Sequence, residues 1–233
     1  MTNYFHRNLN RMALFTALLA VGLLLFLPQF LQIATANIYL NGMIIGTTLF
    51  GIGVCFSEMF KLLPEYRWLC GYKSGRKNIP LPPRLLRSVA LILRRDAGTV
   101  PVGTLQGMLD MILVRFDDAR ESVRYVTNTL IFLGLLGTFW GLVTTVGGFA
   151  ELIGGLSFDD ESVLMALQAG LAQPLGGMAT AFTSSLLGLG GSLIVGFLGL
   201  QVQLAQNAIF RELEEYLAGH AATSGGACAA PMA

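Results

Sequence analysis

Two long stretches without a charged residue constrain this chain more than any other feature. The first runs through Leu130–Thr145 and the second through Pro174–Leu200. A helix needs roughly 20 apolar residues to cross the hydrocarbon core of a bilayer, and we expect both stretches to do so. Hydrophobic residues make up 54% of the chain and charged residues only 12%, whereas soluble domains carry about 25% charged residues. The sequence therefore predicts an integral membrane protein built from helices.

Two further apolar spans precede these stretches, at Met12–Leu31 and Ile38–Phe60. A cleaved signal peptide is the alternative for the first span, because Ala34-Thr-Ala36 follows it. The span exceeds the usual signal core of roughly 7–15 apolar residues, and a second span follows almost at once. We therefore expect four transmembrane helices.

The Lys and Arg residues predict the orientation of these spans. Most of them lie in residues 61–124, and the links 32–37 and 151–173 contain none. Since basic residues concentrate in cytoplasmic loops, both termini and residues 61–124 are expected in the cytoplasm. The fold class is thus an all-α membrane protein with four spans and cytoplasmic ends.

Helical periodicity continues into the predicted cytoplasmic parts. Apolar residues recur from Arg84 to Arg95, and a second helix is expected to begin after Gly103. The apolar face of this second helix comprises Leu105, Met108, Leu109, Ile112, Leu113 and Phe116. With no Pro or Gly between Arg124 and Gly134, that helix should continue into the third span, and at 1.5 Å per residue it would reach roughly 30 Å into the cytoplasm.

The last span is likewise expected to continue as a helix to about Leu217, and the tail after Gly219 to be disordered. Four regions follow from this. Residues 1–62 hold the first two spans, 63–124 a cytoplasmic helical segment, 125–203 the core spans with a short outer link, and 204–233 the helix extension and tail.

The outer link has a local pattern of its own. Ser157 and Asp160 can form a capping box for a short helix through Leu171. Asp159, Asp160 and Glu161 then lie in its first turn, where the helix dipole favours carboxylates. We prefer this local role to an ion-concentrating vestibule.

Residues suited to catalysis or metal binding are scarce. The two histidines, His6 and His220, lie in the terminal regions, and the three cysteines are too far apart for a CxxC zinc motif or a disulfide framework. Phosphate-binding loops and nucleophile elbows are missing from the sequence as well. We therefore expect no enzyme, catalytic residue, metal or cofactor, and no nucleic-acid partner.

Small residues follow a four-residue register in the last two spans. Gly137 and Gly141 form a GxxxG pattern in the third span. The fourth span repeats small residues at positions that include Ser184, Gly188, Ser192 and Gly196. Such registers allow helix backbones to approach closely in lipid, and we expect the third span of one copy to pack on the fourth span of the next.

Hydroxyl groups accompany the small residues and suggest an ion pathway. Thr138 lies 14 residues past Arg124, or roughly 21 Å along a helix, and Thr183 lies nine residues past Pro174, or roughly 14 Å. In a hydrocarbon core of about 30 Å, both fall near the middle. Hydroxyls can coordinate or relay an ion but cannot hold a titratable charge, so the carboxylate for such a path must come from another chain.

Two motifs resemble a known family. Gly134-Leu-Leu-Gly-Thr-Phe-Trp-Gly-Leu142, and Gly170-Leu-Ala with Ala179-Thr-Ala-Phe-Thr-Ser-Ser-Leu-Leu-Gly-Leu189, look like the two core helices of the MotA/TolQ/ExbB proton-channel family. The match covers about residues 125–203. The four-span layout, with a large loop after the second span, is similar to the MotA branch more than to the three-span branch.

The resemblance implies a homopentamer that surrounds a dimer of MotB/ExbD/TolR-like single-span partners, each with a membrane Asp. Thr138 then matches the family's pore threonine, and Thr183 or Thr180 the threonine of the last helix, with Ser184 beside them. The chain departs from the family in lacking the membrane Glu that relatives carry near Gly177 or Met178.

The leading functional hypothesis is therefore an ion-driven stator or channel subunit, for protons or sodium, that powers mechanical work. A passive oligomeric membrane scaffold is the alternative. A secondary transporter is disfavoured because the spans show no inverted repeat and no intramembrane charge. The arginines of residues 61–124 are interpreted as topology determinants and contacts to anionic membrane lipids, each worth about 1 kcal/mol, with binding to a rotor as the alternative.

Overall fold

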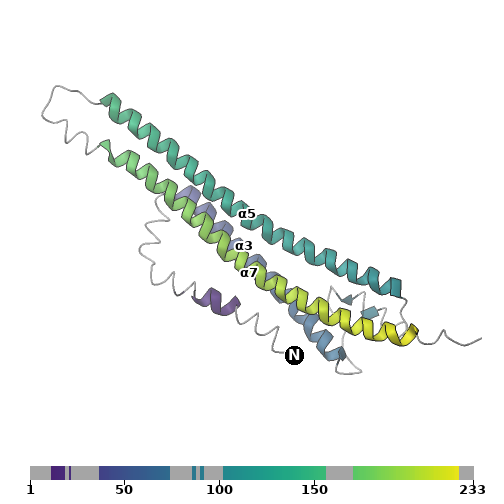
Figure 1. The fold of residues 1–233 in the computed structure, drawn as a ribbon. Coiled ribbons are helices and arrows are strands. Elements are labelled where there is room, and N and C mark those ends of the chain that lie inside the picture. The colour runs from purple at the N-terminus through teal and green to yellow at the C-terminus, as the bar shows by residue number, and fades with distance from the viewer. Residues whose placement is uncertain are drawn as a thin grey trace, which may run out of the picture. The chain divides into compact units, whose positions relative to one another are not determined.

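The computed structural model describes residues 12–18, 21, 37–73, 86–87, 90–91, 102–155 and 170–225. The regular structure within these residues is entirely helical. Three long helices, α3, α5 and α7, account for most of it (Figure 1). All three are long and apolar enough to cross a membrane, which confirms the prediction of a helical protein of the membrane type.

Helix α3 comprises Ile38–Lys73 and begins at an asparagine cap. The Asn37 carbonyl accepts a hydrogen bond from the Asn41 backbone N–H at 2.9 Å, and its side-chain oxygen lies 3.5 Å from the Leu40 nitrogen. The helix continues through Pro64 to Lys73. The change to charged residues at Glu58 and Lys61 thus ends the apolar span but not the helix.

Helices α5 and α7 are each 54 residues long. Helix α5 comprises Val102–Gly155 without interruption, so the prediction that the helix starting near Gly103 continues into the third span is confirmed. Helix α7 comprises Ala172–Gly225 and therefore passes the predicted end at Leu217 by eight residues. The tail expected to be disordered is helical as far as Gly225, and 226–233 lie outside the described residues.

Several sequence-based expectations fall outside the part that the structure describes. Most of the first span lies there, although 12–18 are helical. The expected outer helix from Ser157 also lies outside, and so does most of the expected helix over 84–95, of which 86–87 and 90–91 are described.

The chain divides into two compact units, and each long helix contributes to both. The first unit combines 1–13, 54–122 and 198–233, and the second combines 14–53 and 123–197. Each region predicted from the sequence was one continuous stretch of the chain. Each observed unit instead combines helix segments that are distant in sequence, because long helices pack along their whole length.

The first unit has a core of large apolar side chains. Met108, Ile112 and Phe116 are buried on α5, which confirms this part of the predicted apolar face, whereas Leu113 is exposed. Helix α7 contributes Ile209, Leu213 and Leu217, and α3 contributes Leu62 and Leu69.

Polar side chains of the first unit tie distant segments together. The Arg120 guanidinium donates hydrogen bonds to Gln206 Oε1 at 3.1 Å and to Asn207 Oδ1 at 2.6 Å, and it pairs with Asp117 at 3.2 Å. On α3, the buried carboxylate of Glu65 accepts the backbone N–H of Leu86 at 3.3 Å. The contacts of Arg120 join α5 to α7, and the hydrogen bond to Glu65 joins α3 to the segment that contains Leu86.

Candidate functional site

The second unit contains the seam between α5 and α7, which we define as the row of small residues where the two helices meet. Gly134 faces Gly188, Gly137 faces Ser184, and Gly141 faces Ala181. The partner's number falls as the number on α5 rises, so the helices are antiparallel, as the hairpin of α5 and α7 in Figure 1 also shows.

Three glycines of the predicted packing set leave no room for a side chain. A Cβ at Gly188 would lie 2.6 Å from Gly134 Cα, and one at Gly141 would lie 2.5 Å from Ala181 Cβ. A Cβ at Gly137 would overlap the Ser184 side chain. Glycine at these positions lets the backbones approach closely, as is usual for helices that associate in lipid.

The other two members of that set behave differently. Gly196 has only the Thr127 methyl group nearby, at the ordinary contact distance of 3.9 Å. The buried Ser192 hydroxyl donates to the Leu189 carbonyl of its own helix at 2.8 Å. Gly196 therefore does not need to be a glycine for α5 and α7 to approach each other.

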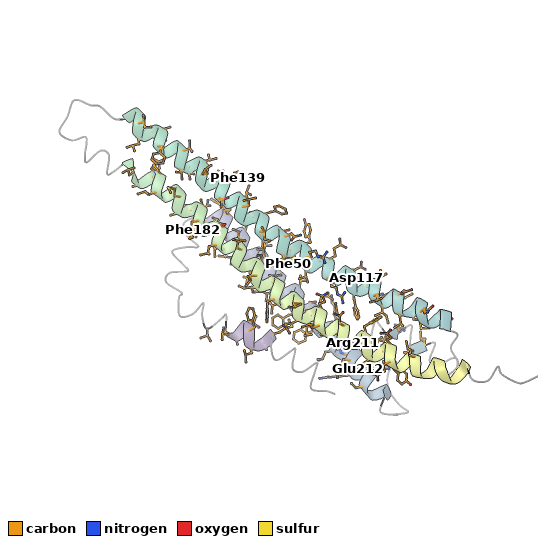
Figure 2. All side chains as sticks on the ribbon, in the orientation of Figure 1. Phe50, Asp117, Phe139, Phe182, Arg211 and Glu212 are labelled. Carbon is orange, nitrogen blue, oxygen red and sulfur yellow. The ribbon has the colours of Figure 1, made fainter. Side chains whose placement is uncertain are left out.

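The glycine rows join two helices of the same chain. The sequence predicts packing between the third span of one copy and the fourth span of the next. In this chain the faces of Gly137, Gly141 and Gly188 are filled by the other helix of the same chain. Packing between copies stays a prediction, and it would use other faces of α5 and α7. The large apolar side chains on those faces include Phe139 and Phe182, both more than half exposed (Figure 2).

Most hydroxyls of the seam donate to carbonyls of their own helix. Thr138 Oγ1 lies 2.6 Å from the Leu135 carbonyl oxygen, and Thr180 Oγ1 lies 3.0 Å from that of Gly176. Thr144 and Thr145 both donate to the Gly141 carbonyl, each at 2.8 Å. Such local bonds satisfy the hydroxyl inside an apolar environment. The Thr hydrogen can still be redirected towards a stronger acceptor.

Two hydroxyls of α7 have no hydrogen-bond partner among the described residues. In the part of the chain that the structure describes, the side chains of Thr183 and Ser185 make no hydrogen bond. Both are partly exposed. Their hydroxyls are therefore available as donors, whereas that of Thr138 would first leave a local carbonyl.

Ser184 lies between these two residues and is fully buried. Its hydroxyl donates to Asn41 Oδ1 at 2.8 Å, and Asn41 is also fully buried. The bond joins residues 143 positions apart and connects α7 to the first turn of α3. Sequence reasoning placed Ser184 in the ion pathway and did not single out Asn41. An asparagine four residues into an otherwise apolar span was the signal that could have identified it.

Helix geometry separates the predicted pair Thr138 and Thr183. Successive residues of a helix are rotated by about 100°, so Thr183 and Ser185 project to opposite sides of Ser184. In an antiparallel pair, the residues that follow the facing residues Gly137 and Ser184 by one step lie on the same side of the seam. Ser185 therefore shares a side with Thr138. Thr183 is level with Thr138 along the seam, as predicted, but lies on the other side.

Helix α3 contacts the seam at three positions: Leu40 would meet a Cβ at Gly137, Asn41 bonds Ser184, and Thr48 would meet a Cβ at Gly191. Relative to Ser184, Gly188, which faces α5, is rotated by about 40° towards Ser185, and Gly191 by about 20° towards Thr183. Helix α3 therefore lies on the side of the seam that carries Thr183. This level is within the first turn of α3. The hydroxyls are thus level with the beginning of α3, and their position near mid-membrane stays a prediction.

The chemistry of the seam is limited to oxygen atoms of hydroxyls and carbonyls. Among the described residues no group of three or more His, Cys, Asp or Glu side chains could hold a metal ion. The hydroxyls can donate to a carboxylate, and both hydroxyl and carbonyl oxygens can partly replace the hydration shell of a small cation. They cannot carry the charge themselves.

Comparisons with protein-family models, with curated proteins and with solved structures found no match to this chain.

Proposed function

We propose that this chain is a subunit of an ion-driven membrane motor of the MotA/TolQ/ExbB type. In this proposal it forms a ring, a pentamer by analogy, around a dimer of single-span partners that each carry a membrane Asp. Ion flow past that Asp, most simply of protons, powers mechanical work on the periplasmic side of a bacterial inner membrane.

The proposal includes four spans with both ends in the cytoplasm. The length and apolar character of α3, α5 and α7 support three of these spans, and the apolar run of Met12–Leu31 supports the fourth. The distribution of Lys and Arg supports the orientation.

The observation that carries the proposal is a seam without charge that has a hydroxyl beside it on the side away from α3. Thr138 follows the facing residue Gly137 by one step, whereas α3, which contacts Gly191, lies on the side of Thr183. This hydroxyl is therefore accessible to another chain. An ionised carboxylate that is buried away from water without a partner is costly, so a donor at this position would assist a partner Asp during its cycle.

The test is replacement of the Thr138 hydroxyl in the full chain, co-expressed with the single-span product of a neighbouring gene. Thr138→Val keeps the shape and removes the donor, and we expect at least a tenfold loss of proton flux into vesicles that contain a pH-sensitive dye. Thr47→Val is the matched control, because Thr47 lies on α3 and its hydroxyl also donates to its own helix, to the Met43 carbonyl. Normal flux in a Thr138→Val assembly of unchanged size would refute the proposal.

A passive oligomeric scaffold remains the second candidate, and one observation favours it. The hydroxyls of Thr138, Thr144, Thr145 and Thr180 are all bonded to carbonyls of their own helices, as expected of residues that only pack. A scaffold would assemble without the single-span partner and would conduct no ions. Co-purification with that partner in a fixed stoichiometry therefore separates the two functions.

A further inference from the structure

From the rotation of α7 we infer that Ser185, and not Thr183, is the α7 hydroxyl that works with Thr138, and that Asn41 is the positioning residue that holds it there. This inference rests on the proposed function and specifies the residues of its ion-facing site.

The anchor is the bond between Ser184 and Asn41. Both residues are fully buried, and the hydroxyl donates to Asn41 Oδ1 at 2.8 Å. A rotation of α7 about its axis would break this bond and leave two polar groups in an apolar interior. The close approach at Gly137, where a Cβ would overlap the Ser184 side chain, further limits such a rotation.

The side of each hydroxyl follows from the contacts of α7. Relative to Ser184, Gly188, which faces Gly134 of α5, is rotated in the sense of Ser185, whereas Gly191, which would meet Thr48 of α3, is rotated in the sense of Thr183. Ser185 therefore projects away from α3. Thr138 shares the side of Ser185, because each follows one of the facing residues Gly137 and Ser184 by one step in an antiparallel pair. Thr138 and Ser185 therefore face the same space, which the described part of α3 does not occupy.

The two hydroxyls of this pair differ in whether they already donate a hydrogen bond. Thr138 donates to the Leu135 carbonyl at 2.6 Å, whereas the Ser185 hydroxyl makes no hydrogen bond within the described residues. An approaching carboxylate would thus meet one donor that is already available and one that has to leave a local acceptor. Ser185 is the first of the two to bind it.

The test begins with cross-linking, which does not depend on ion flux. In the full chain in native membranes, with Cys55, Cys70 and Cys228 changed to Ala, cysteines are introduced as Thr138→Cys with Ser185→Cys, or as Thr138→Cys with Thr183→Cys. A copper–phenanthroline oxidant forms the disulfide, and the linked peptides are quantified by mass spectrometry. We expect the pair at 138 and 185 to link at least tenfold faster. Equal rates, or a faster pair at 138 and 183, would overturn the assignment of Ser185.

The role of Asn41 is tested in the same cross-linking assay. Asn41→Leu and Ser184→Ala both remove the anchoring bond, and the second of them adds no bulk. We expect each to reduce the tenfold preference to less than threefold, whereas Thr47→Val should leave it unchanged. A preference that persists in both variants would overturn the positioning role of Asn41.

Flux measurements separate this inference from the proposed function. We expect Ser185→Ala to lower proton flux at least tenfold and Thr183→Val to lower it less than twofold. The reverse order would overturn the inference even if the chain conducts ions. If the cross-linking preference holds but the assembled complex conducts no ions at all, the arrangement of the helices stands and the proposed function fails.

Discussion

The two units of this chain use the same three helices but hold them together by opposite means. In the second unit, α5 and α7 meet at glycines and small residues, and large side chains such as Phe139 and Trp140 lie on the outside. In the first unit, the helices meet through buried large side chains such as Phe116 and Leu213. The outer surface of α5 there carries charged residues such as Asp117 and Glu121.

The difference follows from the solvent that each unit is expected to contact. In water, large apolar side chains are buried because each contributes about 1.5–3 kcal/mol on removal from water. In lipid that driving force is absent, and helices associate through close backbone approach and hydrogen bonds. A single helix such as α5 can therefore satisfy both conditions by changing its contact residues from Phe116 to Gly137 along its length.

The largest expected effect comes from filling the glycine seam. Gly188→Val should destabilise the chain by about 3 kcal/mol or more, at the upper end of overpacking costs, because its Cβ would meet the backbone of Gly134 and of Leu130. Gly190→Val is the matched control, since nothing lies within 4 Å of a Cβ at Gly190. Thermal unfolding in mild detergent measures both. Similar stability of the two variants would show that the seam does not hold the second unit.

A smaller effect is expected from the polar tie of the first unit. Arg120→Met removes the hydrogen bonds to Gln206 and Asn207 and leaves the buried Gln206 oxygen without this donor. We expect a loss of about 1–3 kcal/mol in the same unfolding assay. Arg115→Met, at an exposed position of α5, should change stability by less than about 0.5 kcal/mol. An equal loss in both variants would point to general charge effects in place of the specific tie.

The smallest effect is expected from an exposed ion pair within α3. Lys61 Nζ lies 2.6 Å from Glu58 Oε1, but half of the Lys61 side chain is exposed. Water screens such a pair, and spacing of three residues on a helix contributes only about 0.2–0.5 kcal/mol. Lys61→Met should therefore be nearly neutral in the unfolding assay. A loss as large as that of Arg120→Met would mean that Lys61 has a further role in the first unit.

The sequence alone determined the class of the protein and the extent of its helices. Charge-free apolar runs identified three membrane-length helices, because the bilayer permits few other structures for such runs. The continuity of α5 past Arg124 into the third span was readable from the absence of Pro and Gly between Arg124 and Gly134. The small residues of the seam were recognisable for the same reason, since their four-residue spacing puts them on one face of a helix.

Only the tertiary structure decided which faces meet. A row of glycines permits close packing on any helix, so Gly137 and Gly188 could not reveal that their partners belong to the same chain. Depth along a helix follows from counting residues, which is why Thr138 and Thr183 were found at one level. The side of the seam depends on rotation, and the bond between Ser184 and Asn41, 143 residues apart, fixes that rotation. No local pattern contains a contact of this range.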